Sequence, residues 1–91
     1  MQYMIVEKFK QGKLKDVYQR FAVRGRLMPE GLTYVNSWIT GDLSTCYQVM
    51  ETDHFHTLEQ WMECWKDLVD FEVAPVITSQ EAKEKADAQP A

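Results

Sequence analysis

Hydrophobic and polar positions alternate along four stretches of the chain and follow helical spacing along two others. The stretches rich in β-branched and aromatic residues predict strands, over residues 3–9, 32–40, 44–51 and 70–78. Apolar residues at helical spacing predict helices over 13–27 and about 54–69. The predicted order is β-α-β-β-α-β, which is the ferredoxin-like α+β arrangement.

This order of elements restricts how the strands can be arranged in the sheet. Right-handed crossovers place the strands 3–9 and 44–51 at the centre and the other two at the edges. Pro75 agrees with an edge position for the last strand, because proline cannot donate a ladder hydrogen bond. Both helices then cover one face of a four-stranded antiparallel sheet. We predict one domain over residues 1–79, and a frayed helix or disordered tail over 80–91, where there is little to bury.

Each predicted helix carries an apolar stripe that should face the core. The first stripe consists of Leu14, Val17, Tyr18, Phe21 and Leu27. The second stripe consists of Phe55, Leu58, Met62, Trp65 and Val69, and Trp61 and Leu68 widen it. Asp53 is the expected N-cap of the second helix, with Thr52 as the alternative. On the first helix, Asp16 and Arg20 stand four residues apart, a spacing that favours an ion pair on the solvent side.

Alternation along the strands separates two sets of side chains, one for each face of the sheet. The more uniformly apolar set is expected to face the helices: Val35, Ser37, Ile39, Tyr47 and Val49. The set expected on the second face is Tyr34, Asn36, Trp38, Cys46, Gln48 and Met50, joined by Glu72 and Val76. This second face mixes aromatic and polar groups, and an exposed patch of that kind usually marks association. A β-bulge in 32–40 or 44–51 would exchange the two faces.

Composition and charge narrow the partners. The chain has 91 residues, an apolar fraction of 45% and a formal net charge of −4. Its acidity disfavours nucleic acid and anionic membranes as partners. No apolar run approaches the ~20 residues that span a bilayer, and the N-terminus lacks the basic start of a signal peptide. We therefore expect a cytoplasmic protein in which Cys46 and Cys64 are reduced.

Few residues are candidates for chemistry. The strand carboxylates Glu7, Glu51 and Glu72 would become acids or bases if buried beside apolar walls, but pairing or exposure is the commoner state. His54 and His56 stand two apart after Asp53, a spacing that does not make a metal site on a helix. The sequence shows no catalytic triad, phosphate loop or cofactor motif. We predict no metal and no cofactor, and we assign no catalytic residue.

Arginines near the end of the first helix allow two interpretations. Arg24 and Arg26 flank a glycine in "RGRLMPEG" and could bind an anion. Basic residues are also common at helix C-termini, where they have a structural role. In that case Arg26 would pair with Glu30 or with a carboxylate of the sheet. Trp61 and Trp65 are expected in the core, whereas Trp38 would be an interface anchor or a pocket wall.

Four segments carry a resemblance to a known family. The stretches "YMIVEKF", "GRLMPEGLTYVNSW", "CYQVMETD" and "WKDLVDFEVAPVITS" resemble a bacterial domain-of-unknown-function family numbered 3303, over residues 1 to about 82. That family is placed among the dimeric α/β-barrel proteins. The resemblance implies a homodimer whose two sheets face each other. It implies no activity, since the wider superfamily includes cofactor-free monooxygenases, isomerases, haem proteins and ligand-sensing domains.

Taken together, the sequence favours a small cytoplasmic homodimer that binds a small molecule in a pocket at the sheet face. The candidate ligand-binding residues are Glu7, Asn36, Trp38, Gln48 and Glu72. Two alternatives stay open: a cofactor-free enzyme of the monooxygenase or isomerase kind, and a purely structural dimer.

Overall fold

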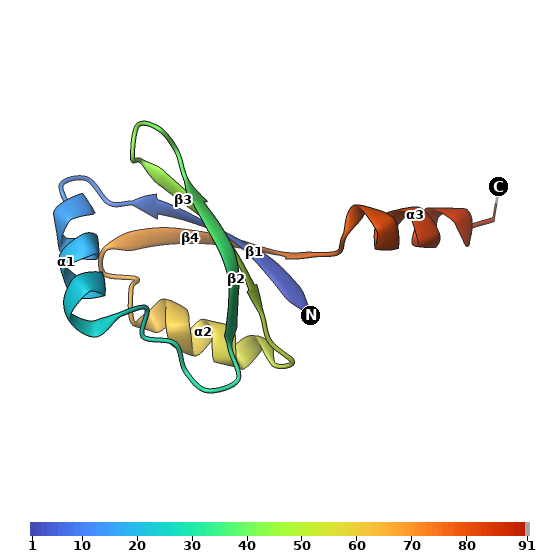
Figure 1. Cartoon of the computed structure of the whole chain (residues 1–91), viewed down its shortest axis with the longest axis horizontal. Coiled ribbons are helices and arrows are strands. Elements are labelled where there is room, and N and C mark those ends of the chain that lie inside the picture. The colour runs from blue at the N-terminus through green and yellow to red at the C-terminus, as the bar shows by residue number, and fades with distance from the viewer. Residues whose placement is uncertain (91) are drawn as a thin grey trace.

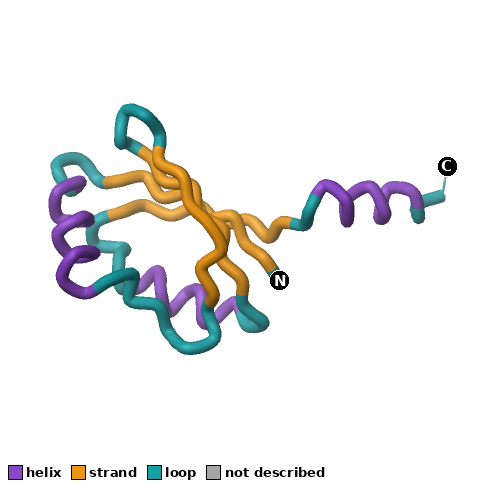
Figure 2. The backbone as a smooth tube through the Cα atoms, in the orientation of Figure 1, coloured by secondary structure: helices purple, strands orange, loops and turns teal. Residues whose placement is uncertain are grey.

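The computed structural model describes residues 1–90 and shows the predicted order of elements, followed by a third helix (Figure 1). The strands are β1 (Gln2–Phe9), β2 (Thr33–Ile39), β3 (Thr45–Glu51) and β4 (Val69–Val76). The helices are α1 (Leu14–Arg24), α2 (Phe55–Glu63) and α3 (Ser79–Asp87). The antiparallel sheet has the order β2-β3-β1-β4, so the ferredoxin-like α+β prediction is confirmed, with Pro75 on an edge strand. Figure 2 shows α1 and α2 on the same side of this sheet.

An irregularity in β2 changes which side chains share a face. The register between β2 and β3 shifts between Tyr34 and Asn36, which leaves Val35 as an extra residue. Tyr34 therefore pairs with Met50 on the helix side, whereas Trp38 pairs with Tyr47 on the opposite side. The prediction for β2 was thus right for residues 36–39 and wrong for Tyr34.

The face assignment for β3 was wrong as a whole. Cys46, Gln48 and Met50 are buried on the helix side, and Tyr47 and Val49 face away from the helices. The reason is that the helix side holds a partly polar hollow as well as a core. For β3, choosing the more uniformly apolar set of side chains therefore selected the wrong face of the sheet.

The hydrophobic core lies between the sheet and α2. Ile5 and Met50 from the sheet and Leu58 from α2 are 0% exposed, and Trp61 is 1% exposed. The remaining buried members of this core are Leu32, Trp65, Leu68 and Val69. The prediction that Trp61 and Trp65 belong to the core is confirmed.

The second helix is shorter than predicted. It ends at Glu63, and tight turns carry the chain from there to β4 at Val69. Its N-cap is His54, not Asp53 or Thr52. The hydroxyl of Thr52 is buried and accepts a hydrogen bond from the His54 backbone N–H at 3.2 Å. The Thr52 hydroxyl therefore bonds to the residue that precedes the helix and does not cap the first helical turn.

The first helix is attached differently, because none of its residues is buried. Its Arg20 forms two hydrogen bonds of 2.7–2.8 Å to the Asp67 carboxylate and a third, of 2.9 Å, to the Cys64 carbonyl oxygen. The predicted pair between Arg20 and Asp16 is absent from the ion pairs of the described residues. Arg20 therefore ties α1 to the segment after α2.

The third helix projects away from the body of the molecule (Figure 1). Thr78 and Glu81 form a capping box at its start, and none of its residues is buried. Among the described residues, no helix is both long and apolar enough to cross a membrane.

Candidate functional site

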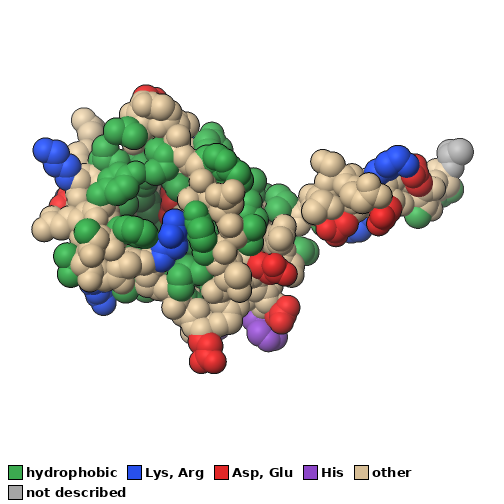
Figure 3. Space-filling view, viewed as in Figure 1, with side chains coloured by type: hydrophobic (Ala, Val, Ile, Leu, Met, Phe, Trp, Pro, Cys, Tyr) green, Lys and Arg blue, Asp and Glu red, His purple; other side chains and the backbone are tan. Residues whose placement is uncertain are grey.

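A pocket of about 280 Å³ lies on the helix side of the sheet, beneath α1. It is lined by Glu7, Phe9, Val17, Tyr18, Phe21, Arg26, Ser37, Ile39, Cys46, Gln48, Trp61 and Trp65. Cross-strand pairing builds its floor, because Ile39 pairs with Cys46, and Cys46 with Glu7. Figure 3 shows the hollow among hydrophobic side chains, with a basic side chain beside it.

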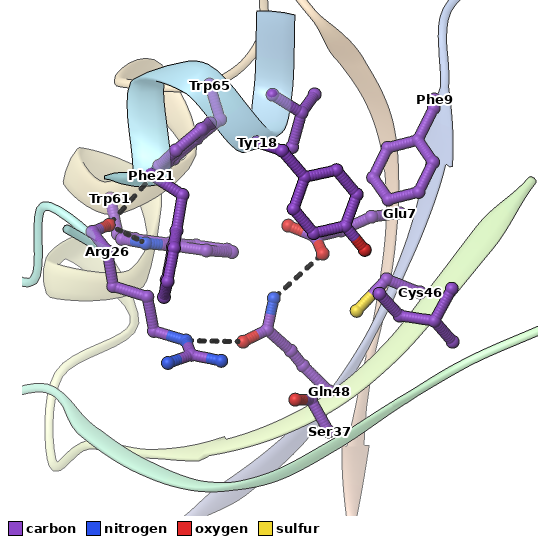
Figure 4. A pocket seen from close by; sticks show the side chains of 12 residues that line it. Glu7, Phe9, Tyr18, Phe21, Arg26, Ser37, Cys46, Gln48, Trp61 and Trp65 are labelled. Atoms are coloured by element: carbon purple, nitrogen blue, oxygen red, sulfur yellow. Dashed lines mark hydrogen bonds between the residues drawn. The ribbon is translucent and has the colours of Figure 1, made fainter. Parts of the chain in front are cut away.

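Three polar side chains form a hydrogen-bonded chain inside this mainly apolar pocket (Figure 4). Nε of Arg26 donates to Oε1 of Gln48 at 3.4 Å, and Nε2 of Gln48 donates to Oε2 of Glu7 at 2.8 Å. Glu7 is only 7% exposed and Gln48 only 4%. A buried carboxylate needs such partners, since burying a charge without them costs several kcal/mol. The Gln48 amide therefore connects Arg26, the basic residue of the pocket lining, with Glu7, its acidic one.

The surroundings of Glu7 disfavour its charged form. Burial raises the pKa of the Glu7 carboxyl above its usual value, while hydrogen bonds from Cys46 and Gln48 and the charge of Arg26 oppose that rise. The carboxylate can therefore hold a proton at a higher pH than an exposed glutamate. A carboxyl group of this kind in a pocket is a candidate for proton transfer.

Unlike the Glu7 carboxyl, the Cys46 thiol is poorly suited to a role in catalysis. Its burial and the neighbouring Glu7 carboxylate raise the pKa of Cys46 to about 12. Because the thiolate is the reactive form of cysteine, Cys46 is a poor nucleophile. Cys46 and Cys64 form no disulfide.

The loop after α1 places the Arg26 side chain in the pocket. The indole N–H groups of Trp61 and Trp65 both donate to the Arg26 backbone carbonyl oxygen, at 2.9 and 3.0 Å. The residues on either side have positive φ angles, 68° at Gly25 and 60° at Leu27. A leucine in this left-handed region is strained, and such strain persists only where the surrounding structure fixes it. The two core tryptophans thus fix the backbone from which Arg26 extends.

Aromatic rings then orient the Arg26 guanidinium. Its carbon lies 3.7 Å from the centroid of the Tyr34 ring and 5.2 Å from that of Phe21. Both distances fall within the range of a cation–π contact. The expected pairing of Arg26 with Glu30 or a sheet carboxylate is replaced by these contacts and by the Gln48 amide.

The five ligand-binding candidates from the sequence divide between the two faces of the sheet. Glu7 and Gln48 lie together in the pocket. Asn36, Trp38 and Glu72 lie on the opposite face, where Trp38 is 55% exposed and Glu72 forms an exposed ion pair with Lys8 at 3.4 Å. Ligand binding by any of the five stays a prediction. Among the described residues, Asp53, His54 and His56 belong to no group suited to hold a metal ion.

Several pocket residues were not identified as site residues from the sequence. Tyr18 and Phe21 have the same helical spacing as core residues, so only the space under α1 distinguishes them. Arg26 was considered as an anion ligand but not as part of a site with Glu7. The signal that could have found it is the adjacent glycine in "RGR", which allows the turn that directs Arg26 back toward the sheet.

The fold and pocket define an α+β ferredoxin-like protein with a small hollow between one helix and the sheet. The model of the family described as "Domain of unknown function (DUF3303)" matches residues 1–89, and the chain belongs to that family. Comparisons with curated proteins and with solved structures found no match.

Proposed function

We propose that the protein is a homodimer that binds a small molecule in the pocket beneath α1. The observation that carries this proposal is the buried chain from Arg26 through Gln48 to Glu7 inside an otherwise apolar hollow. Ligand pockets are typically apolar, with a few polar groups that fix the orientation of the ligand. Well-packed apolar residues in place of buried charged groups are often no less stable, so stability alone does not explain this chain of polar groups.

The proposed dimer rests on the outer face of the sheet, which we define by Met4, Val6, Trp38, Tyr47, Val49 and Ala74. Its cross-strand neighbours are Trp38 and Tyr47, Tyr47 and Val6, Val49 and Met4, and Met4 and Ala74. The apolar side chains thus run from one edge strand to the other, and Trp38 and Tyr47 are 55% and 41% exposed. The same face also carries Asn36 beside Val49 and Glu72 beside Val6, and an exposed patch that mixes aromatic and polar groups in this way usually marks an interface. A second copy would cover it with its own outer face, sheet against sheet, as in a dimeric α/β barrel.

A second function, proton-transfer catalysis without a cofactor, is favoured by one observation. Glu7 lines the pocket and burial raises its pKa, as expected of a general acid or base. This function would use the same pocket and would require ligand binding first. Binding is therefore the first property to test.

A pocket-filling substitution tests small-molecule binding. Ser37 lines the pocket, and the neighbouring Asn36 points to the other face of the same strand. We expect compounds that raise the melting temperature of the wild-type protein in a metabolite screen to lose that effect on Ser37→Leu. They should keep it on Asn36→Leu. A screen without any stabilising compound, or with hits insensitive to Ser37→Leu, would contradict the proposal.

A charge placed on the outer face tests the dimer. Light scattering during size-exclusion chromatography should give twice the monomer mass for the wild type. Trp38→Glu should give the monomer mass, because a dimer would bury the new carboxylate twice, once in each copy. Val23→Glu is the matched control, since Val23 is 78% exposed on α1 and lies outside the outer face. A monomeric wild type would refute the dimer.

A further inference from the structure

We infer that the pocket selects small organic acids, whose carboxylate binds the Arg26 guanidinium while the apolar part lies beneath α1. This inference rests on the proposed binding function and adds the chemical class of the ligand. It starts from the donors of Arg26. The hydrogen bonds of residues 1–90 use only its Nε, and they leave both terminal nitrogens, Nη1 and Nη2, without a protein acceptor.

The guanidinium is held in place without being neutralised by a direct ion pair. Tyr34 and Phe21 contact it, and Gln48 accepts from its Nε. Among the described residues, no carboxylate forms an ion pair with Arg26, because the Gln48 amide lies between it and Glu7. Two adjacent N–H donors with a fixed orientation match the two oxygens of a carboxylate. A less ordered arginine would lose more entropy on binding.

Glu7 determines the orientation of such a ligand. A second carboxylate beside Glu7 would meet a like charge in a poorly solvated site. The acidic group of the ligand therefore belongs at Arg26, on the other side of Gln48 (Figure 4). The apolar part of the ligand would then lie against Trp61 and Phe21. Glu7 remains able to accept a hydrogen bond from a hydroxyl or amine on that part.

The size of the pocket limits the ligand to a small molecule. Its volume of about 280 Å³ lies just below the ~300–1,000 Å³ that is typical of ligand sites. The walls include four aromatic rings besides Tyr18, those of Phe9, Phe21, Trp61 and Trp65. A single-ring aromatic acid matches this combination of size, wall and charge.

Three probes with the same ring and different charge test this inference: phenylacetate, phenylacetamide and phenethylamine. Calorimetric titration should show phenylacetate binding roughly ten times more tightly than the amide, as expected for a charged hydrogen-bonded pair. Arg26→Gln should remove that preference. The backbone carbonyl of Arg26 still accepts from Trp61 and Trp65 in this variant, so the loop should keep its fold. Arg24→Gln, at an exposed position of α1 outside the pocket, should behave as the wild type.

The outcomes separate this inference from the proposed function. Equal affinity for phenylacetate and phenylacetamide, or tighter binding of phenethylamine, would refute acid selection and leave small-molecule binding standing. An acid preference that survives Arg26→Gln would also refute it, because another group would then bind the carboxylate. If none of the three probes bound and the metabolite screen also gave no hit, both the inference and the proposed function would fail.

Discussion

The two helices that cover the sheet occupy equivalent places in the repeated βαβ arrangement, yet they have different roles. Leu58 and Trp61 of α2 pack in the core, where they are 0% and 1% exposed. α1 carries an apolar stripe of the same kind, but Tyr18 and Phe21 remain 45% and 41% exposed. The space beneath α1 is the pocket, whereas the space beneath α2 is filled by packed side chains.

The difference shows that an amphipathic stripe defines which side of a helix faces the sheet but not how close the helix lies to it. α2 is held by direct packing on Ile5 and Met50. α1 is held through Arg20, in its second half, which bonds to Asp67 and lies 5.5 Å from the centre of the Trp65 ring. This polar attachment runs to the segment after α2 and not to the sheet, and Tyr18 and Phe21, on either side of Arg20 in the sequence, line the pocket.

The largest expected effect comes from the same truncation in each helix. Leu58→Ala should lower the free energy of unfolding by about 2–5 kcal/mol, because it leaves a cavity in a packed core. Leu14→Ala, in half-buried surroundings on α1, should cost about 1 kcal/mol or less. Urea unfolding at equal protein concentration measures both values. Equal losses would show that α1 packs as closely as α2 and would remove the basis for the pocket.

The sequence could predict the parts of the fold that depend on local pattern. The order of elements, the central and edge strands and the two core tryptophans all follow from periodicity and from the right-handed crossover. The periodic pattern behind each of these predictions extends over several residues, so a single exceptional residue does not change the prediction. The bulge at Val35 is one residue long and has no marker such as a glycine, so the sequence could not place it.

The candidate site could be predicted only in part for a related reason. Glu7 and Gln48 stand out as polar residues in strands, but their common location depends on how β1 and β3 pair. The assignment of Gln48 to the outer face assumed that the more uniformly apolar set of side chains faces the helices. The pocket breaks that assumption, because Glu7, Ser37 and Gln48 line it on the side of the sheet where a core would exclude polar groups.

The next largest effect is expected at Glu7, because its burial in the pocket affects the free energy of unfolding. Because burial raises the pKa of Glu7, the unfolded chain releases this proton more readily than the folded one. Stability from this group is therefore fully present below its ordinary pKa of 4.5 and is lost as the pH rises through the folded value. Glu7→Gln stays neutral and keeps an oxygen that accepts from Gln48. We expect its melting temperature to exceed that of the wild type by a few degrees near neutral pH.

The pH dependence separates this explanation from a general effect of the substitution. The advantage of Glu7→Gln should disappear below pH 4.5, where the wild-type carboxyl is itself protonated. Glu59→Gln, at an exposed position of α2, should change the melting temperature little at any pH. A lower melting temperature for Glu7→Gln near neutral pH would mean that its carboxylate stabilises the fold. The contrast between the proposed binding pocket under α1 and the packed core under α2 would then lose support.

The smallest expected effect concerns the attachment of α1 through Asp67. The Arg20 guanidinium lowers the pKa of Asp67 from 3.8 to about 2, so the ionised pair contributes above pH 3.8 and is lost as the pH falls toward 2. Asp67→Asn should therefore speed amide hydrogen exchange in α1 severalfold near neutral pH and leave α2 unchanged. Asp87→Asn, which removes an exposed pair with Lys83 in α3, is the control. In the wild type, the ratio of α1 to α2 exchange rates should rise between pH 4 and 2, whereas in Asp67→Asn it should stay constant. A constant ratio in the wild type would mean that packing alone holds α1, as it holds α2.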